Sequence, residues 1–390
     1  MSISGFSPLR PVLAALLLAA CLCPPWPATA QDLDGNASGG RAVVNNGDTY
    51  SIVDGRKAES WAGSAIVRNG HVDVDGGTAN QVFGGWALGA RSITQYNSVA
   101  VHGGSISLNV YGGYSFADQS ARSNSNTVVQ NDGATSHVIG GSADSNRAGS
   151  TSDSNIVLLR GGTSGLVMGG YASGFTGAES LYNLVSITGG DIESVVGGDA
   201  ATTHGTANAS FNAVLIDGGS VKGNVIGGLV HMQSTGQNLV ARYNAVTIVN
   251  GTISGDVYGS AETDSLGATT PRPAAGSGNT LNLLGWRGTL RRVAAFQNIN
   301  LALPNGMPSG DTLLTLGSGQ AADDLQGSTV RVLGALGGQG MRIGDRYTLV
   351  RGTGTGDLSL RDGGVVHDAP KGFALLFDGS MQRNGNAIDL

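Results

Sequence analysis

A unit of about 29 residues recurs along this chain and restricts its fold more than any other feature. Each copy begins with an Asn, continues with alternating aliphatic residues and a Gly-rich stretch, and ends in Val-Tyr-Gly-Gly or a close variant. Clear copies start at Asn97, Asn126, Asn155, Asn183, Asn212 and Asn244, so that successive starts are 29, 29, 28, 29 and 32 residues apart. One weaker copy starts at Asn279, and another is centred on Val72 and Val74. Repeats of this length are typical of solenoids, in which each unit buries its apolar side against its neighbours.

The first segment of each copy has the pattern of a short strand. In the stretch from Asn212 to Ile216, residues 212, 214 and 216 share one face because side chains alternate along a strand. Stacked copies would therefore form aliphatic ladders, to which other copies contribute Val99 and Val101, Val157 and Leu159, Val185 and Ile187, and Val246 and Ile248. Asn shares this inward face, and stacked Asn side chains can hydrogen-bond along a ladder, so we predict that these asparagines are structural.

Glycine accounts for 65 of the 390 residues and recurs as two pairs in four of the six clear copies. We expect both pairs to form corners, since glycine adopts positive φ without steric strain. The polar stretches after the second pair vary in length and are expected to be loops: 142–154, 172–182 and 199–211. Short β-branched strands with glycine corners predict an all-β parallel β-helix.

The repeats divide the chain into four segments. Residues 1–30 form a predicted signal peptide, 31–64 an N-terminal cap, 65–275 the β-helix array and 276–390 a β-rich C-terminal cap. The boundary is placed near 275 because an insertion at 261–278 interrupts the period. Atypical caps are expected because the end coils of a solenoid expose unpaired strand edges.

The first 30 residues have the features of an export signal. Arg10 precedes an apolar run from Val12 to Ala20, and Ala28-Thr29-Ala30 forms a small-residue cleavage site before Gln31. An alternative is lipoprotein processing, because Leu18-Ala19-Ala20-Cys21 resembles a lipobox. Both cysteines, Cys21 and Cys23, precede Ala30, so cleavage there leaves no disulfide and stacking must supply the stability.

The charge of the chain argues against nucleic acid as a partner. The net charge is −6, with 22 basic and 28 acidic residues. Binding to a phosphate backbone needs a basic stripe, whereas the densest basic group here consists only of Arg287, Arg291 and Arg292.

The chain shows no recognisable catalytic, cofactor or metal motif. The outward positions of the first strand carry no ionisable residue: Ser98, Ala100, Thr127, Val129, Ile156, Leu158, Leu184, Ser186, Ala213, Leu215, Ala245 and Thr247. Carboxylates for acid–base chemistry would have to come from elsewhere, and we interpret Asp191, Glu193, Asp199 and Asp217 as solvated rim residues. The six histidines lack metal-ligand spacing and are interpreted as isolated surface residues. We therefore expect no cofactor, no metal and no enzyme activity.

Aromatic residues recur close to the second glycine pair. They form either an exposed adhesive strip or contacts that hold loops onto the rod, and we favour loop packing for Phe83, Trp86, Tyr111, Tyr114, Tyr171 and Tyr258. Four outward aliphatic residues are also more apolar than a solvated strand face, so loops or a partner are expected to cover Ile156, Leu158, Leu184 and Leu215.

The copies starting at Asn97 and Asn212 resemble the repeats of Gram-negative autotransporter (type V secretion) passenger domains. The motifs are Asn97-Ser-Val-Ala-Val-His-Gly-Gly, followed by Val110-Tyr-Gly-Gly-Tyr114. The stretches 278–283, 293–301, 312–316 and 344–350 look like the segment that follows such repeats, so the resemblance covers residues 65–390. It implies a right-handed parallel β-helix.

The resemblance also implies a place and a role. Such passengers are displayed at the cell surface or released, commonly for adhesion to host-cell or bacterial surface molecules. Family members continue into an outer-membrane translocator barrel, which this sequence does not encode. The translocator is therefore implied in cis or in trans, and the periplasm is the alternative location. We expect a non-enzymatic adhesin or host-interaction scaffold; the alternative is a secreted polysaccharide lyase or hydrolase, since such enzymes also use β-helices.

Overall fold

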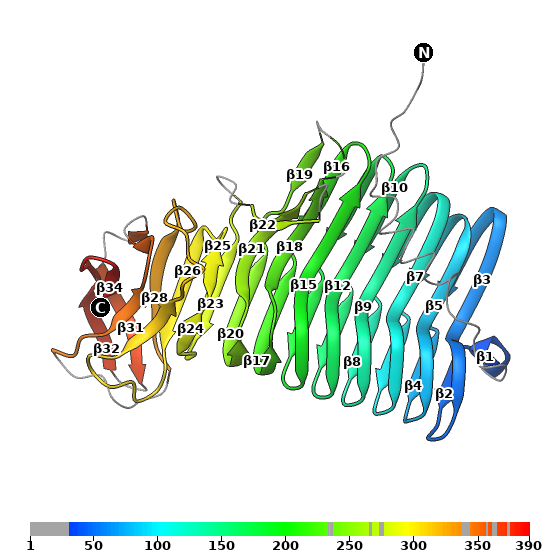
Figure 1. Cartoon of the computed structure of the whole chain (residues 1–390), viewed down its shortest axis with the longest axis horizontal. Helices are drawn as coiled ribbons and strands as arrows, with labels where there is room; N and C mark the ends of the chain where they lie inside the picture. Colours follow the sequence, from blue (N-terminus) through cyan, green and yellow to red (C-terminus); the bar gives the residue numbers. More distant parts are fainter. Residues whose placement is uncertain are drawn as a thin grey trace, which may run out of the picture.

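The computed structural model describes residues 31–232, 234, 237–264, 267–272, 277–336, 344–355, 358–360, 365–372 and 375–390. Strands stack in parallel along one axis, as Figure 1 shows, and confirm the predicted parallel β-helix. The predicted signal peptide and Ala30 of its cleavage site lie outside the described residues, while Gln31 is the first residue of β1 (Gln31–Asp34). None of the helices in the described part is both long and apolar enough to span a membrane.

One face of the solenoid consists of strands that carry the predicted aliphatic ladders. Val157, Val185 and Val214 lie in register on consecutive strands and are at most 1% exposed. The strands pair in parallel in this order: β2 (Arg41–Val44), β4 (His71–Val74), β6 (Ser98–Val101), β8 (Thr127–Gln130), β11 (Ile156–Leu159), β14 (Leu184–Ile187), β17 (Ala213–Val221), β20 (Ala245–Ile253), β23 (Thr280–Leu284), β26 (Asn298–Leu303), β28 (Thr329–Ala335) and β30 (Ser359–Leu360).

A second series of strands, most of them longer, continues each coil: β3 (Thr49–Arg68), β5 (Thr78–Gln95), β7 (Ser105–Asn124), β9 (Ala134–Ser145), β12 (Thr163–Gly174), β15 (Asp191–Thr202), β18 (Val225–Met232), β21 (Asp256–Thr263) and β25 (Arg292–Ala294). The second glycine pairs lie in β5, β7, β9, β12, β15 and β18. Neighbours in this series also pair in parallel.

The stretches that we expected to be polar loops are mostly strands. They contain the ends of β9, β12 and β15 together with β10 (Gly149–Asp153), β13 (Gly177–Leu181) and β16 (Thr206–Ser210), and the next coil adds β19 (Asn238–Val240). Small side chains fill the interior in this part of the coil, and because Ala and Ser are also common in loops, the inward face of these strands resembled a loop sequence. The inward residues include Ala172, Ala178, Ala200, Ala207, Ser152 and Ser180.

The predicted asparagine ladder runs from Asn97 to Asn279. In each step the side-chain Nδ2 donates to Oδ1 of the next Asn, over distances of 2.9 to 3.4 Å. The backbone N–H of each asparagine from Asn97 to Asn244 donates to the same oxygen. The buried amides are therefore satisfied by neighbouring coils, as the sequence predicts.

Only one of the two glycine pairs behaves as expected. The first pair turns the chain with positive φ, for example at Gly104 and Gly162. For the second pair the predicted positive φ is wrong, since none of those glycines has positive φ and the strand continues through them. Space explains their identity: a Cβ on Gly170 would lie 2.6 Å from the side-chain amide atoms of Asn183.

The stack extends beyond the expected array at both ends. Parallel pairing of β3 with β5 begins at Thr49, so the expected cap at 31–64 already contains a coil; β1 and the short 3-10 helix η1 (Gly35–Ser38) precede it.

Toward the C-terminus, a second sheet contains β24 (Gly288–Leu290), β27 (Thr312–Leu316), β29 (Thr348–Arg351), β34 (Ala387–Asp389) and β33 (Gln382–Arg383), and β31 (Val365–Gly372) pairs with β32 (Leu375–Ser380). Backbone hydrogen bonding between strands does not require the side-chain motif of the repeat, so coils continue where the sequence repeat is no longer recognisable. Antiparallel β34 occupies the edge of β29 that the next coil would need.

Candidate functional site

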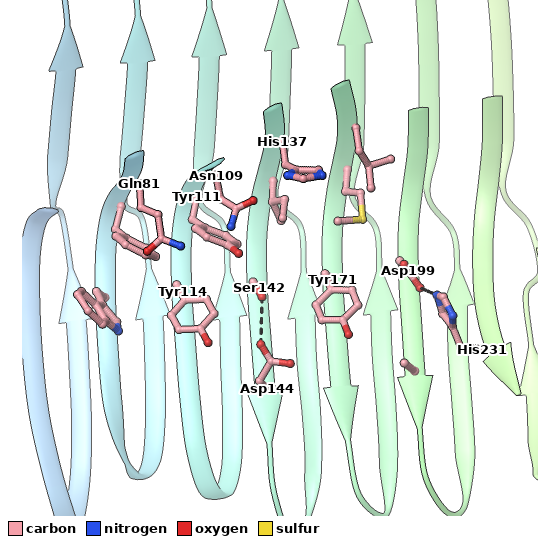
Figure 2. A pocket seen from close by; sticks show the side chains of 16 residues that line it. Gln81, Asn109, Tyr111, Tyr114, His137, Ser142, Asp144, Tyr171, Asp199 and His231 are labelled. Carbon is pink, nitrogen blue, oxygen red and sulfur yellow. Dashed lines mark hydrogen bonds and ion pairs between the residues drawn. The ribbon is translucent and has the colours of Figure 1, made fainter. Parts of the chain in front are cut away.

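A groove with a volume of about 390 Å³ lies on the outer surface beside the second glycine pairs. Its lining comes from six consecutive long strands, β5, β7, β9, β12, β15 and β18. Figure 2 shows the side chains spread over successive strands, from Gln81 to His231. The groove therefore extends across coils, in the direction of stacking.

The glycine pair explains why two columns of side chains enter the same groove. Phe83 and Trp86 are three residues apart and would leave opposite faces of a straight strand. Val82 and Ala87 both face inward although they are an odd number of residues apart, so the strand bends across Gly84 and Gly85. Both rings therefore reach the groove, where they stack with centroids 4.8 Å apart. Strand register repeats both positions on the following coils: Tyr111, Ile139 and Met168 continue the first column, and Tyr114, Ser142, Tyr171 and Asp199 continue the second.

Four aromatic rings form a continuous surface at one end of the groove. Phe83 lies parallel to Tyr111, with centroids 5.2 Å apart, and Tyr111 lies 5.2 Å from Tyr114. These residues line the groove together with other strand residues, and loop packing does not account for them. Tyr258 lies outside the groove, where its hydroxyl donates to Asp256. Phe83 is only 4% exposed, so the partly exposed rings of Trp86, Tyr111 and Tyr114 supply the apolar surface at this end of the groove.

Two buried polar atoms in the groove lack a hydrogen-bond partner among the described residues. They are Nε1 of Trp86 and Nδ1 of His137, whereas the Tyr171 hydroxyl interacts with the Ser173 side chain. The carboxamides of Gln81 and Asn109 lie in register with His137 along the same wall. An unsatisfied buried donor or acceptor costs about 1–3 kcal/mol. Both unpartnered atoms are closed to solvent, so the polar groups that a ligand can reach are half-buried side chains of the groove such as Gln81 and Asp144.

Asp144 is an acidic group in the middle of the groove. The Ser142 hydroxyl donates to its carboxyl over 3.4 Å, as Figure 2 shows. Burial raises the pKa of Asp144 to about 7. Burial also raises the pKa of the neighbouring Tyr114 and Tyr171 hydroxyls. The side chain is therefore a hydrogen-bond donor in mildly acidic solution and a carboxylate above neutral pH.

Asp199 and His231 form an ion pair at the far end of the groove. Oδ1 of Asp199 lies 2.8 Å from Nε2 of His231, and Asp199 is 6% exposed. Burial alone lowers the pKa of His231, but the Asp199 carboxylate outweighs it and the net shift is upward. In contrast, burial lowers the pKa of His137, which favours its neutral form. The pair thus provides compensating charges, and His137 provides a neutral imidazole.

The groove contains residues that the sequence analysis misjudged. Of the four carboxylates interpreted as rim residues, Asp191, Glu193 and Asp217 are exposed, but Asp199 is buried in the groove. His137 and His231 are likewise not isolated surface residues. Asp144 was missed because its strand was read as a loop. Alignment of the copies on their second glycine pair would have revealed the column Tyr114, Ser142, Tyr171 and Asp199.

A second aromatic column lies outside the groove, directly before the ladder asparagines. Tyr182, Phe211 and Tyr243 have φ values of 55°, 59° and 54°, in the left-handed region that bulky residues rarely adopt. Their rings stack at centroid distances of 5.0 and 5.1 Å. The sequence analysis did not identify this column. Tyr182 remains 58% exposed.

No metal site emerges from the residues that the structure describes. Within those ranges, no group of three or more His, Cys, Asp and Glu side chains is placed to hold an ion. Comparisons of the chain with protein-family models, curated proteins and solved structures gave no match.

Proposed function

We propose that this protein is an exported, adhesin-like scaffold of the autotransporter-passenger type that binds carbohydrate in its groove without catalysis. The observation that carries the proposal is the aromatic surface of Trp86, Tyr111 and Tyr114, packed on the buried Phe83, beside half-buried polar side chains such as Gln81 and Asp144. A sugar ring has apolar C–H faces that pack on aromatic rings and hydroxyl groups that hydrogen-bond around its edge. The groove combines both properties in one place.

The electrostatics of the groove favour a neutral sugar over an anionic polymer. None of the described residues that line it is Lys or Arg. Asp144 and the Asp199–His231 pair would not attract phosphate or sulfate, which proteins bind with cationic side chains. The preferred partner is therefore a neutral glycan on a host-cell or bacterial surface, and not a nucleic acid.

The spacing of the acidic groups supports binding rather than cleavage. Strand register places Asp144 and Asp199 two coils and two residues apart, so their Cα atoms are separated by about 12 Å. Tyr171 lies between them in Figure 2. Glycoside hydrolysis by a carboxyl pair needs roughly 5–9.5 Å between the two carboxyl groups. Because both side chains leave the same face, they are poorly placed to act on a single glycosidic bond.

Binding to immobilised neutral polysaccharides tests the proposal. Residues 31–390 are expected to bind at least one such polymer, and Trp86→Ala is expected to weaken binding about tenfold, or about 1.4 kcal/mol. Tyr182→Ala removes an exposed aromatic ring outside the groove and should leave binding unchanged. Equal binding by both variants, or no binding by the parent protein, would refute carbohydrate recognition by the groove. Release of new reducing ends from the polysaccharide would refute the proposal that the protein binds without catalysis.

A further inference from the structure

We propose that the groove binds a linear, neutral polysaccharide segment that lies along the solenoid axis and contacts successive coils. This inference rests on the proposed carbohydrate-binding function and specifies the class and direction of the ligand. The groove is lined by six consecutive strands from β5 to β18. Neighbouring strands are about 4.8 Å apart, so the lining extends about 24 Å along the axis.

The spacing of the coils matches the ligand. The strand separation is close to the length that one pyranose residue adds to an extended chain, so consecutive sugars would meet consecutive coils. In register along the axis, such a chain would pass Trp86, Tyr114, Ser142, Tyr171 and Asp199. The column therefore combines three aromatic rings with two hydrogen-bonding groups, spaced close to the repeat distance of the polymer.

The two long walls of the groove differ in chemistry, and both follow the axis. One wall carries Gln81, Asn109 and His137 on consecutive strands. The other carries the rings of Trp86, Tyr114 and Tyr171. A chain along the axis would keep one edge of each sugar on the amides and imidazole, and one face on the aromatic rings. A ligand lying across the axis would contact only one or two coils and leave most of these groups unused.

Both ends of the proposed site are marked by changes in the lining. At the β5 end, Trp86 is in register with Lys57 of β3, whose Nζ lies 4.2 Å from the Trp86 ring centroid. At the other end, the column that contains Asp199 continues as Leu229 and Ala261, which pack in a buried apolar cluster. The polar and aromatic lining therefore spans about six coils, which predicts a segment of about six sugar residues.

Chain-length dependence distinguishes this arrangement from recognition of a glycan end. The probes are linear oligosaccharides of two to eight residues from the β-1,4-glucan, β-1,4-mannan and α-1,4-glucan series, with affinity measured by calorimetry on residues 31–390. Affinity for the recognised series should rise with each added sugar up to about six and then level off. An affinity that is already maximal with a di- or trisaccharide would overturn the axial arrangement and leave carbohydrate binding intact. Failure of all three series and of their parent polymers to bind would overturn both.

Two distant aromatic residues provide an independent test of direction. Trp86 and Tyr171 are three coils apart along the second column, on β5 and β12. Trp86→Ala and Tyr171→Ala should each weaken the hexasaccharide about tenfold and together about a hundredfold, since distant sites act additively. Tyr182→Ala is the matched control. If only one of the two substitutions affects the hexasaccharide while both variants retain the unfolding transition of the parent, the ligand does not extend along the axis.

Discussion

The side-chain Nδ2 of Asn183 and its backbone N–H both donate to Oδ1 of Asn212, each over 3.0 Å. One oxygen thus accepts two hydrogen bonds from the preceding coil. Asn183 is 1% exposed, so water cannot replace these bonds. The asparagine therefore joins the coils through backbone and side chain together, and a residue of similar volume without the amide cannot do the same.

Asn183→Leu is expected to destabilise the fold by about 2–4 kcal/mol, because the two donors of Asn155 lose their shared acceptor in a buried site. Urea unfolding measured by circular dichroism checks this value. Asn146→Leu is the control, since Asn146 is exposed and lies outside the ladder. Equal midpoints for both variants would contradict a structural role of the ladder.

Gly170→Ala is expected to destabilise the protein by about 1–3 kcal/mol, because the added methyl group overlaps the Asn183 amide at 2.6 Å. Gly149→Ala is the comparison within a neighbouring strand. A Cβ there would meet only the carbonyl oxygen of Gly177, at an ordinary 3.5 Å, so its stability should change little. Thermal unfolding of the two variants checks the difference, and a tolerant Gly170 would show that space beside Asn183 is not the constraint.

Val214→Asp is expected to prevent folding or to destabilise the stack by several kcal/mol, because it buries an unpaired charge in the aliphatic ladder. Leu215→Asp places the same charge on the next residue, whose side chain is only half-buried on the outer face. It should fold with a much smaller loss of stability. Soluble yield and unfolding midpoints compare the variants, and similar behaviour of both would argue against the alternation of the two faces.

Asp144→Asn is expected to remove part of the pH dependence of stability. The native pKa of Asp144, about 7, exceeds the ordinary value of 3.8. Between pH 4 and 7 the native state therefore keeps a proton that the unfolded state has lost, and stability decreases as the pH rises. The variant should match the parent near pH 4 and exceed its stability by about 1–2 kcal/mol at pH 8. Urea titrations of the parent and the variant at pH 4 and pH 8 test this prediction, with the exposed Asp191→Asn as control. It would be refuted if the variant and the parent showed the same change in unfolding free energy between the two pH values.

Repetition made the architecture predictable. A solenoid needs only local information repeated in register, so the period and alternation identified inward residues such as Val214 and the ladder position of Asn212. Prediction failed where small residues fill a thin interior, because alanine and serine carry no strong hydrophobic signal. It also failed for the second glycine pairs, where a neighbouring amide occupies the space and the backbone needs no positive φ.

The sequence by itself determined that equivalent residues stack, because a fixed period leaves each coil no other partner for its apolar face. Only the tertiary structure decided that Trp86, Tyr114, Asp144, Asp199 and His231 line one groove. These residues come from strands up to five coils apart, and the bends at the glycine pairs bring both columns to one surface. Their burial and pairing, and hence the shifted pKa values of Tyr114, Asp144 and His231, arise from contacts between coils that no single repeat contains.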